Sequence, residues 1–525
     1  MTQRVLGIDL GTTNSCAAIL VNDEIHVIPD ETGQRTQASV VSFLDDGTIL
    51  VGNLAKDERV MNPANTIYSA KRLIGREFDS PEVSSARSAL PFRVVKGRRQ
   101  ESFLEIRGER YALPEISGMI VRRMKDLAEA YLGQPIERAV ITVPANFSDT
   151  QRQMTKLAGE LAGLDVLRVI NEPTAAALAY GYGHDVNARV AIYDFGGGTF
   201  DISLLDIRQN VFEVIGTAGD SYLGGDDIDD RLARYMRLAF EKQHGLSLDG
   251  DLNAWNRLKF VAEKTKRELS ETERAIVNVH ELAANDRHEM CDLRFQLDRK
   301  SFNARVKDIV ERTFLICDEA LRNARITVDD LNEIIMVGGS TRLPIVREMI
   351  HGYFGVTPLN DINPDEVVAV GAAIQGAALV NDHFEADAPD VHPLLLDITP
   401  QSLGIQTINE YFDILIDRNS QTPCEQTKVF TTTSDQQTIV RIRIYQGESR
   451  QVSENVQLGE VELFGLRAAP RGEVQIEVKF EVDTNGMVSV SAIDLETGLG
   501  QSVRLEISAG YDEGAIAAMK ARLQS

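Results

Sequence analysis

The 525-residue chain is poor in cysteine, has a deficit of positive charge and contains no long apolar run. Its four cysteines lie far apart, without CxxC pairs or histidines at zinc spacing, which argues against a disulfide framework or a zinc cluster. No segment approaches the roughly 20 apolar residues of a membrane span, and no signal peptide is evident, so we expect a cytoplasmic protein. The net charge of −24 argues against binding to nucleic acid or to an anionic membrane.

What is present indicates a globular protein with more than one domain. The chain is 43% hydrophobic and 26% charged, and it exceeds the roughly 300 residues at which a single core stops growing. From residue 1 to about 385, short apolar strands alternate with helical stretches, which is the pattern of an α/β domain. We therefore predict layered sheets with helices outside them.

Residues 382–397, DHFEADAPDVHPLLLD, differ from both flanking regions. Acidic residues and two prolines precede three consecutive leucines, as in a linker. Beyond them, segments such as QTIVRIRIYQGE alternate apolar and polar residues, and Asn485-Gly486 fits a hairpin turn between two such segments. The sequence therefore predicts an antiparallel β domain after the linker. Residues 512–524 then have helical spacing over about three turns.

Two segments 185 residues apart share one plan: VLGIDLGTTNSCAAIL and VAIYDFGGGTFDISLL each contain a strand ending in Asp, a glycine-rich turn with Thr, and a second strand. Such turns allow backbone N–H groups to face phosphate oxygens. A single copy could equally be an ordinary hairpin, but two copies favour a two-lobed cleft for a polyphosphate. A carboxylate from each lobe would face Mg²⁺, which keeps several waters, so Asp9 and Asp194 could act through water.

A third segment, EIIMVGGSTRLPIVREMI from Glu333, reads as a strand, a glycine pair and a helix that could hold a nucleoside. Together with GIDLGTTNS, NTIYSAKRLIGREF, AVITVPANFSDTQRQ, INEPTAAALAYG, DFGGGTFDIS, LGGDDID and NPDEVVAVGAAIQG, it resembles the DnaK-type seventy-kilodalton heat shock protein family. The resemblance covers nearly the whole chain and ends where the helical lid of that family would begin. It suggests a lid-truncated or short member.

The resemblance implies a multidomain fold: an α/β actin-like (ribonuclease H-like, duplicated) ATPase domain plus an antiparallel β-sandwich peptide-binding domain. The expected ranges are 1–387 for the ATPase domain, 388–398 for an apolar linker, 399–508 for the β-sandwich and 509–525 for the start of a C-terminal helix. The implied function is that of an ATP-dependent chaperone, in which hydrolysis of ATP to ADP and phosphate controls binding and release of extended apolar peptide segments. The implied cofactors are ATP or ADP and Mg²⁺, with K⁺ as a further candidate.

Site residues are carried over position by position. Catalysis is assigned to Lys71, Glu172, Asp201, Thr199 and Asp9, and the metal to Asp9 and Asp194. Nucleotide binding is assigned to Gly11, Thr12, Thr13, Asn14, Gly196, Gly197, Gly198, Gly224, Gly225, Glu263, Lys266, Arg267, Ser270, Gly338, Gly339, Ser340, Arg342 and Asp365. These residue types suit phosphoryl transfer, which depends on in-line positioning and charge neutralisation.

In the β domain the resemblance assigns the peptide site to Ile405, Ile408, Phe430, Thr433, Val440 and Ile442. Without the resemblance, these residues would be interpreted as sandwich core. Coupling between the domains is assigned to Pro144, Arg152, Leu394, Leu395, Leu396 and Asp397. The chain departs from the family pattern at Pro393 and at residues 409–412, which read NEYF.

The expected partners are unfolded or extended polypeptides, a J-domain co-chaperone contacting Arg168, Asn171 and Asp397, and a nucleotide-exchange factor. Two other functions found in the wider actin, sugar-kinase and heat-shock ATPase superfamily remain as alternatives. A metabolite kinase would transfer phosphate to a small alcohol, and a filament-forming protein would polymerise with nucleotide. Neither accounts for the linker and the β domain.

Overall fold

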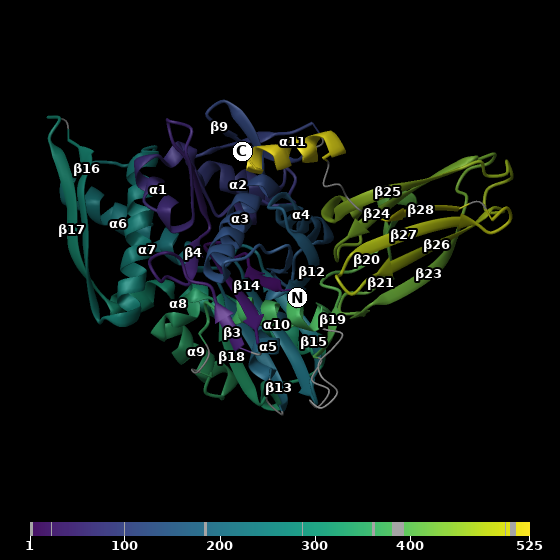
Figure 1. Ribbon diagram of the computed structural model, residues 1–525. Helices are drawn as coiled ribbons and strands as arrows, with labels where there is room; N and C mark the ends of the chain where they lie inside the picture. Colours follow the sequence, from purple (N-terminus) through teal and green to yellow (C-terminus); the bar gives the residue numbers. More distant parts are fainter. Residues whose placement is uncertain are drawn as a thin grey trace.

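The structure, a computed structural model, describes residues 4–524 except 23, 99, 183–185, 286, 360–362, 381–392, 499 and 505–510. It consists of an α/β body from which a β-sandwich projects on one side, while the β16–β17 hairpin projects on the other (Figure 1). The expected domain boundaries at 387/388 and 508/509 lie outside the described residues.

The first sheet of the body is built around an antiparallel hairpin and a parallel neighbour. Strand β1 pairs antiparallel with β2 and parallel with β11. Leu6 and Ile8 of β1 pack into the core beneath α3 and α4, whereas Val5 belongs to the core around α10 on the opposite face. The elements are β1 (Val5–Asp9), β2 (Asn14–Val21), β3 (Glu24–Val27), β4 (Thr36–Ala38), β11 (Arg138–Val143), β12 (Asp165–Asn171), α3 (Leu113–Leu132), α4 (Asp149–Leu161) and α10 (Val367–Val380).

Two small sheets and several short helices complete this half of the body, which we call the first lobe (described residues between 4 and 182). One sheet is β6-β5-β7 and the other is β10-β9-β8. The elements are β5 (Val40–Phe43), β6 (Ile49–Val51), β7 (Thr66–Tyr68), β8 (Arg93–Lys96), β9 (Ser102–Ile106), β10 (Glu109–Ala112), α1 (Glu58–Met61), α2 (Pro81–Ala89) and the 3₁₀ turns Gly52–Ala55, Pro63–Asn65 and Ala70–Arg72.

The second sheet repeats this plan in the second lobe (described residues between 186 and 359). Strand β13 pairs antiparallel with β14 and parallel with β18, and β14 pairs antiparallel with β15. The elements are β13 (Asn187–Phe195), β14 (Phe200–Arg208), β15 (Val211–Asp220), β16 (Arg274–Ala284), β17 (Met290–Asp298), β18 (Glu333–Val337), α5 (Glu172–Gly181), α6 (Gly225–His244), α7 (Leu252–Glu271), α8 (Arg299–Ala324), α9 (Pro344–Phe354) and the 3₁₀ turns Val328–Asp330 and Gly339–Arg342. Helix α5 belongs to the first lobe in sequence but packs against β14 and α10.

The leucine segment of the expected linker forms strand β19 (Leu394–Ile398), which extends the second sheet. Leu394, Leu395 and Leu396 lie opposite Val211, Phe212 and Glu213 of β15 in a parallel ladder. Leu395 is 9% exposed and packs in the core that contains Phe212, whereas Leu394 is 54% exposed. The linker therefore continues the sheet of the α/β body.

The β domain is a sandwich of two antiparallel sheets, as the alternation predicts. The sheet orders are β21-β20-β24-β25 and β23-β26-β27-β28, and strand β22 pairs with β19. At the predicted turn, the Asp483 carboxylate accepts from the N–H groups of Asn485 and Met487. The elements are β20 (Leu403–Gln406), β21 (Phe412–Ile416), β22 (Gln421–Thr422), β23 (Cys424–Thr431), β24 (Ile439–Gln446), β25 (Val456–Phe464), β26 (Gln475–Val482), β27 (Val488–Asp494), β28 (Gly500–Arg504) and the 3₁₀ turns Ile408–Glu410 and Val452–Glu454.

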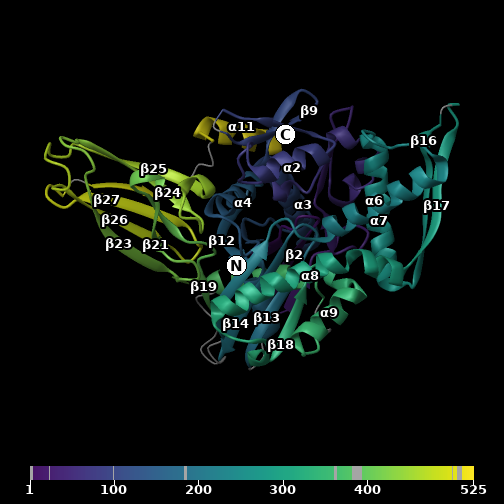
Figure 2. The same cartoon turned by 180° about the vertical axis from the view of Figure 1, so that it is seen from behind.

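The C-terminal helix α11 (Glu513–Gln524) lies against the first lobe, near α2 and α3, and away from the sandwich tip (Figure 1 and, from behind, Figure 2). Met519 is buried in the first-lobe core. At Gly118 of α3 an added Cβ would lie 2.9 Å from Leu523, so the absence of a side chain allows this close approach. Arg522 pairs with the buried Glu115 at 2.8 Å.

Candidate functional site

The two glycine-rich turns meet at the base of the cleft between the lobes. One turn lies between β1 and β2, and the other lies between β13 and β14. A Cβ added to Gly197 would lie 1.8 Å from the Thr13 hydroxyl, so only glycine allows the turns to approach this closely. The side chain of Thr13 has a buried hydroxyl without a hydrogen-bond partner. The two turns therefore lie in close contact across the cleft, with the Thr13 hydroxyl between them.

Lys71 lies in the short 3₁₀ turn after β7 and points into this cleft. Its ammonium donates to the Glu172 carboxylate at 2.6 Å and to the Leu10 carbonyl, and both side chains of the ion pair are less than 10% exposed. Glu172 is the first residue of α5, followed by Pro173, a residue favoured in a first helical turn. The pair brings together two residues 101 positions apart, both expected in catalysis.

Three buried aspartates surround the pair. Burial and the neighbouring Glu172 carboxylate raise the pKa of Asp9 to about 7, although Lys71 acts in the opposite direction. The pKa values of Asp194 and Asp201 are also raised by burial and by Glu172. Both carboxylate oxygens of Asp201 are buried without a hydrogen-bond partner. Such a concentration of acidic oxygens is a site that favours cations.

A single cavity connects half of the expected nucleotide-binding residues with most of the expected catalytic and metal residues. Of the residues predicted from the sequence, its walls include Asp9, Gly11, Thr12, Thr13, Asn14, Lys71, Glu172, Asp194, Gly196, Gly197, Thr199, Gly338, Gly339 and Asp365. Other predicted residues lie outside its walls: Gly198, Asp201, Gly224, Gly225, Glu263, Lys266, Arg267, Ser270, Ser340 and Arg342. The structure therefore brings the first glycine-rich turn, part of the second, Lys71, Glu172 and part of the third segment around one cavity, and the remaining predicted residues lie on adjoining elements.

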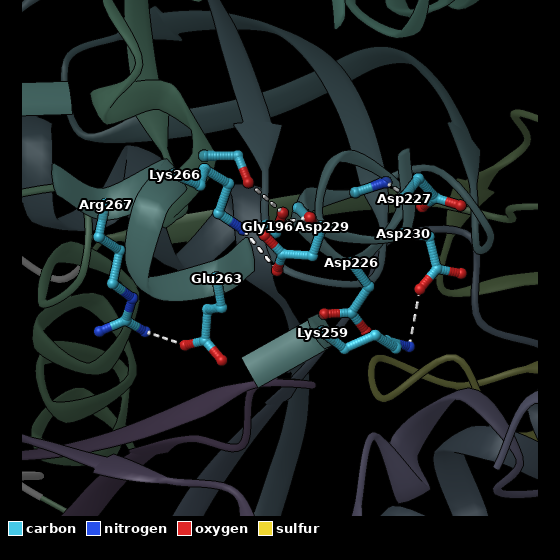
Figure 3. Close-up of polar contacts among 12 residues, drawn as sticks. Gly196, Asp226, Asp227, Asp229, Asp230, Lys259, Glu263, Lys266 and Arg267 are labelled. Atoms are coloured by element: carbon cyan, nitrogen blue, oxygen red, sulfur yellow. Dashed lines mark hydrogen bonds and ion pairs between the residues drawn. The ribbon is translucent and has the colours of Figure 1, made fainter. Parts of the chain in front are cut away.

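The nucleoside-side residues are held by polar contacts on the second lobe, some of which Figure 3 shows. Lys266 donates to the Asp229 carboxylate at 2.8 Å and to the Gly225 carbonyl at 3.1 Å. The Ser270 hydroxyl donates to the Lys266 carbonyl, as expected for residues one helical turn apart. Separately, Ser340 donates to the Gly196 carbonyl at 2.8 Å, and Arg342 pairs with Asp365 at 2.6 Å.

Contacts that no sequence motif predicts connect the two lobes above the cleft. Lys56 and Arg59 of the first lobe pair with Glu263 of the second lobe at 3.6 Å and 3.0 Å. The Arg59 guanidinium also lies 4.3 Å from the centre of the Tyr68 ring. Burial would raise the pKa of Glu263, but the cations Arg59, Arg267 and Lys56 outweigh it and lower that pKa to about 2. No local signal in the sequence pairs residues two hundred positions apart.

The contact between the α/β body and the sandwich is polar and buried. Asn171 donates to the Asp397 carboxylate at 2.7 Å, and the guanidinium of Arg152 donates to Asn171. The Asp149 carboxylate accepts from the Val488 N–H at 3.3 Å. Of the residues expected to couple the domains, Arg152 and Asp397 therefore lie in one hydrogen-bonded chain. Pro144 lies in the loop after β11, where its carbonyl accepts from Phe147.

A second, larger cavity lies in the β-sandwich. Its volume is about 780 Å³, and its walls include all six predicted peptide-site residues: Ile405, Ile408, Phe430, Thr433, Val440 and Ile442. Ile442 is buried at 5% exposure, whereas Ile408 is 66% exposed on the loop before β21. The groove thus has an apolar floor and an exposed apolar rim.

Among the described residues, no helix is long and apolar enough to cross a membrane. A family model described as "Hsp70 protein" matches residues 5–525, which is almost the entire sequence. The match extends across the cleft, the leucine strand, the sandwich groove and the C-terminal helix. The chain therefore belongs to the Hsp70 protein family.

Proposed function

We propose that this chain is an ATP-driven molecular chaperone of the DnaK type, in which hydrolysis in the lobe cleft controls peptide binding in the sandwich groove. The observation that carries the proposal is strand β19, which belongs to the sheet of the second lobe and leads directly into the sandwich. A nucleotide-dependent movement of the lobes would therefore be transmitted through β19 to the groove.

The residues of the cleft support hydrolysis. The backbone N–H groups of the two glycine turns would bind the phosphates, and the Lys71 ammonium would orient the γ-phosphate and the attacking water. Glu172, Asp201 and Thr199 would position that water, which suits a reaction governed by positioning and electrostatics. In this proposal the glycines at 224, 225, 338 and 339 approach the nucleotide, and Glu263, Lys266, Arg267, Ser270, Ser340, Arg342 and Asp365 enclose the adenosine.

Magnesium fits the acidic part of the cleft. Asp9 and Asp194 supply hard oxygen donors, and Asp201 has two buried oxygens without partners. Among the described residues, no three acidic, histidine or cysteine side chains converge closely enough to bind a bare ion, which supports contact through water. When bound, Mg²⁺ neutralises charge on the phosphates. A potassium ion is a further candidate for the same acidic region.

The groove supports binding of extended apolar segments. A peptide strand could bond to the strand edges with its backbone while an apolar side chain enters the pocket between Ile405, Phe430 and Val440. The proposed partners are unfolded polypeptides, a J-domain co-chaperone contacting Arg168, Asn171 and Asp397, and a nucleotide-exchange factor. Arg168 already donates to the Thr484 carbonyl of the sandwich at 2.8 Å.

The test is steady-state ATP hydrolysis with and without an extended apolar peptide. We expect the peptide to stimulate wild-type hydrolysis, and Lys71→Ala to lower turnover by at least a hundredfold because the buried cation is lost. Lys156→Ala, which removes an exposed lysine of α4, is the control and should hydrolyse ATP normally. Absence of hydrolysis in the wild type, or phosphate transfer to a small alcohol, would overturn the proposal. Hydrolysis without stimulation would refute the coupling only.

A further inference from the structure

A half-exposed charged pair lies at one edge of the sandwich, between its two sheets. Strands β21 and β23 belong to different sheets and pack against one another at this edge. On β23, Cys424 and Phe430 face the core, and Lys428 shares their side of the strand. On β21, Asp413 lies opposite Ile405, a core residue of β20, so Asp413 shares the core side of its sheet. Both inward positions therefore carry charges of opposite sign.

Lys428 and Asp413 form an ion pair across the space between the two sheets. The Lys428 ammonium lies 2.8 Å from both oxygens of the Asp413 carboxylate and 5.7 Å from the centre of the Phe430 ring. The side chains are 48% and 26% exposed, so water still reaches the pair. A pair in this environment contributes little to stability, because water screens it and the flexible side chains lose entropy. Its position therefore calls for another explanation.

The pair lies directly beside the peptide groove. Asp413 is opposite Ile405 in the β20–β21 ladder, and Lys428 is opposite Val478 in the β23–β26 ladder. Ile405 and Val478 both line the groove, as does Phe430. Asp413 also follows the loop that carries Ile408, whereas Lys428 precedes the loop that carries Thr433. The pair thus connects the bases of the two loops that border the groove.

We propose that Asp413 and Lys428 are positioning residues that hold the two loop bases together and thereby set how fast a bound peptide leaves the groove. This inference rests on the proposed peptide-binding function of the sandwich. A half-hydrated ion pair suits the task because it can separate at small cost when the loops move apart. A sealed apolar contact at the same edge would resist that movement. The peptide itself is recognised by the apolar groove, and the pair acts through Ile405 and Phe430.

The test is a double-mutant cycle on peptide dissociation from the full chain, with a fluorescent apolar peptide followed by stopped flow in the presence of ADP. Asp413→Asn and Lys428→Gln should each speed dissociation by roughly two- to fivefold, the range expected of a partly exposed pair. The double variant should be no faster than either single variant, because the second change removes nothing further. The charge-exchanged protein, Asp413→Lys with Lys428→Asp, should release peptide at nearly the wild-type rate.

Salt and a matched control separate this role from a general effect of charge. At about 1 M salt the Debye length falls to roughly 3 Å, so the wild type and single variants should converge. Glu425→Gln removes one of the two carboxylate partners of Lys479 within one sheet, on the same strand β23, and should leave dissociation unchanged. Thermal unfolding of each variant checks that the fold is retained. Purely additive effects, or no recovery in the exchanged protein, would overturn the inference. If the wild type bound no peptide, the proposed function itself would fail.

Discussion

At the scale of single residues, Asp149 illustrates how the contact between the body and the sandwich changes the properties of a carboxyl group. Asp149 begins α4, and its backbone N–H donates to Gln446 of the sandwich at 3.2 Å. Burial raises the pKa of its carboxyl group to about 7. The Val488 N–H, Gln153 and Arg152 lower the pKa and Asp483 raises it, but burial dominates. Separation of the domains would expose this carboxyl group and so lower its pKa towards the ordinary value.

Contact between the body and the sandwich should therefore strengthen as the pH falls from about 7 towards about 5. In this range Asp149 binds a proton when the body and the sandwich are in contact but not when they are apart. Acidification therefore raises the equilibrium constant for contact by up to about tenfold per pH unit. Energy transfer between dyes on the two domains would measure the change. Asp149→Asn should flatten the profile, leaving only the part due to Asp397, whose pKa burial also raises. A profile in Asp149→Asn as steep as that of the wild type would contradict this assignment.

Individual site residues could be predicted only where a local pattern identifies them. Asp9, Asp194 and the glycine turns follow from short strand–turn–strand segments, and the structure places them around one cavity. Glu263 was expected beside the adenosine, and its pairing with Arg59 was not foreseen. An arginine in a short helix carries no sequence signal of the partner it meets across a cleft. The ion pair of Asp413 and Lys428 likewise depends on how two sheets pack.

At the scale of elements, the strand that pairs with β19 could not be predicted from the sequence. The acidic and proline-rich composition predicts a linker, and its leucines do not by themselves identify β15 as their partner. A strand that joins a sheet through residues 183 positions away is recognised by its partner and not by its own periodicity. Helices α3, α4 and α6 were predictable because their apolar periodicity is local.

The two sides of β19 should respond differently to one change. Leu395→Asp would place a carboxylate in the core that contains Phe212, so β19 should detach and peptide stimulation of ATP hydrolysis should fall at least fivefold. Leu394→Asp changes an exposed side chain on the same strand and should retain at least half of the stimulation. The measurement is the ratio of hydrolysis rates with and without peptide. If both variants lost peptide stimulation equally, the added negative charge on β19, and not the burial of Leu395, would determine coupling.

At the scale of the whole molecule, the two lobes are connected above the cleft through Glu263. Of the first-lobe residues that contact Glu263, Arg59 lies closest, and the Arg59 side chain is only 15% exposed. Loss of one partner of a buried ion pair is costly because the remaining charge stays buried. Lys56 and Arg267 would still neutralise Glu263 in part, so the cost should be moderate.

Arg59→Ala should accelerate release of ADP by about tenfold, which corresponds to about 1.4 kcal/mol. The reason is that the lobes would open more readily once the contact of Arg59 with Glu263 across the cleft is lost. Stopped-flow displacement of a fluorescent ADP analogue would measure the rate. Arg93→Ala, which breaks an exposed pair with Glu105 inside the first lobe, is the control and should release ADP at the wild-type rate. An unchanged rate in Arg59→Ala would mean that other contacts hold the lobes.

The position of α11 has a consequence for the order of events during protein synthesis. Met519 completes an apolar core whose other members come almost entirely from the first 170 residues. A ribosome makes those residues long before it reaches Met519, so the first lobe emerges with part of its apolar surface uncovered. Contacts between residues so distant in sequence form late and slowly. The nascent first lobe must therefore remain protected from aggregation until nearly the whole chain has been translated.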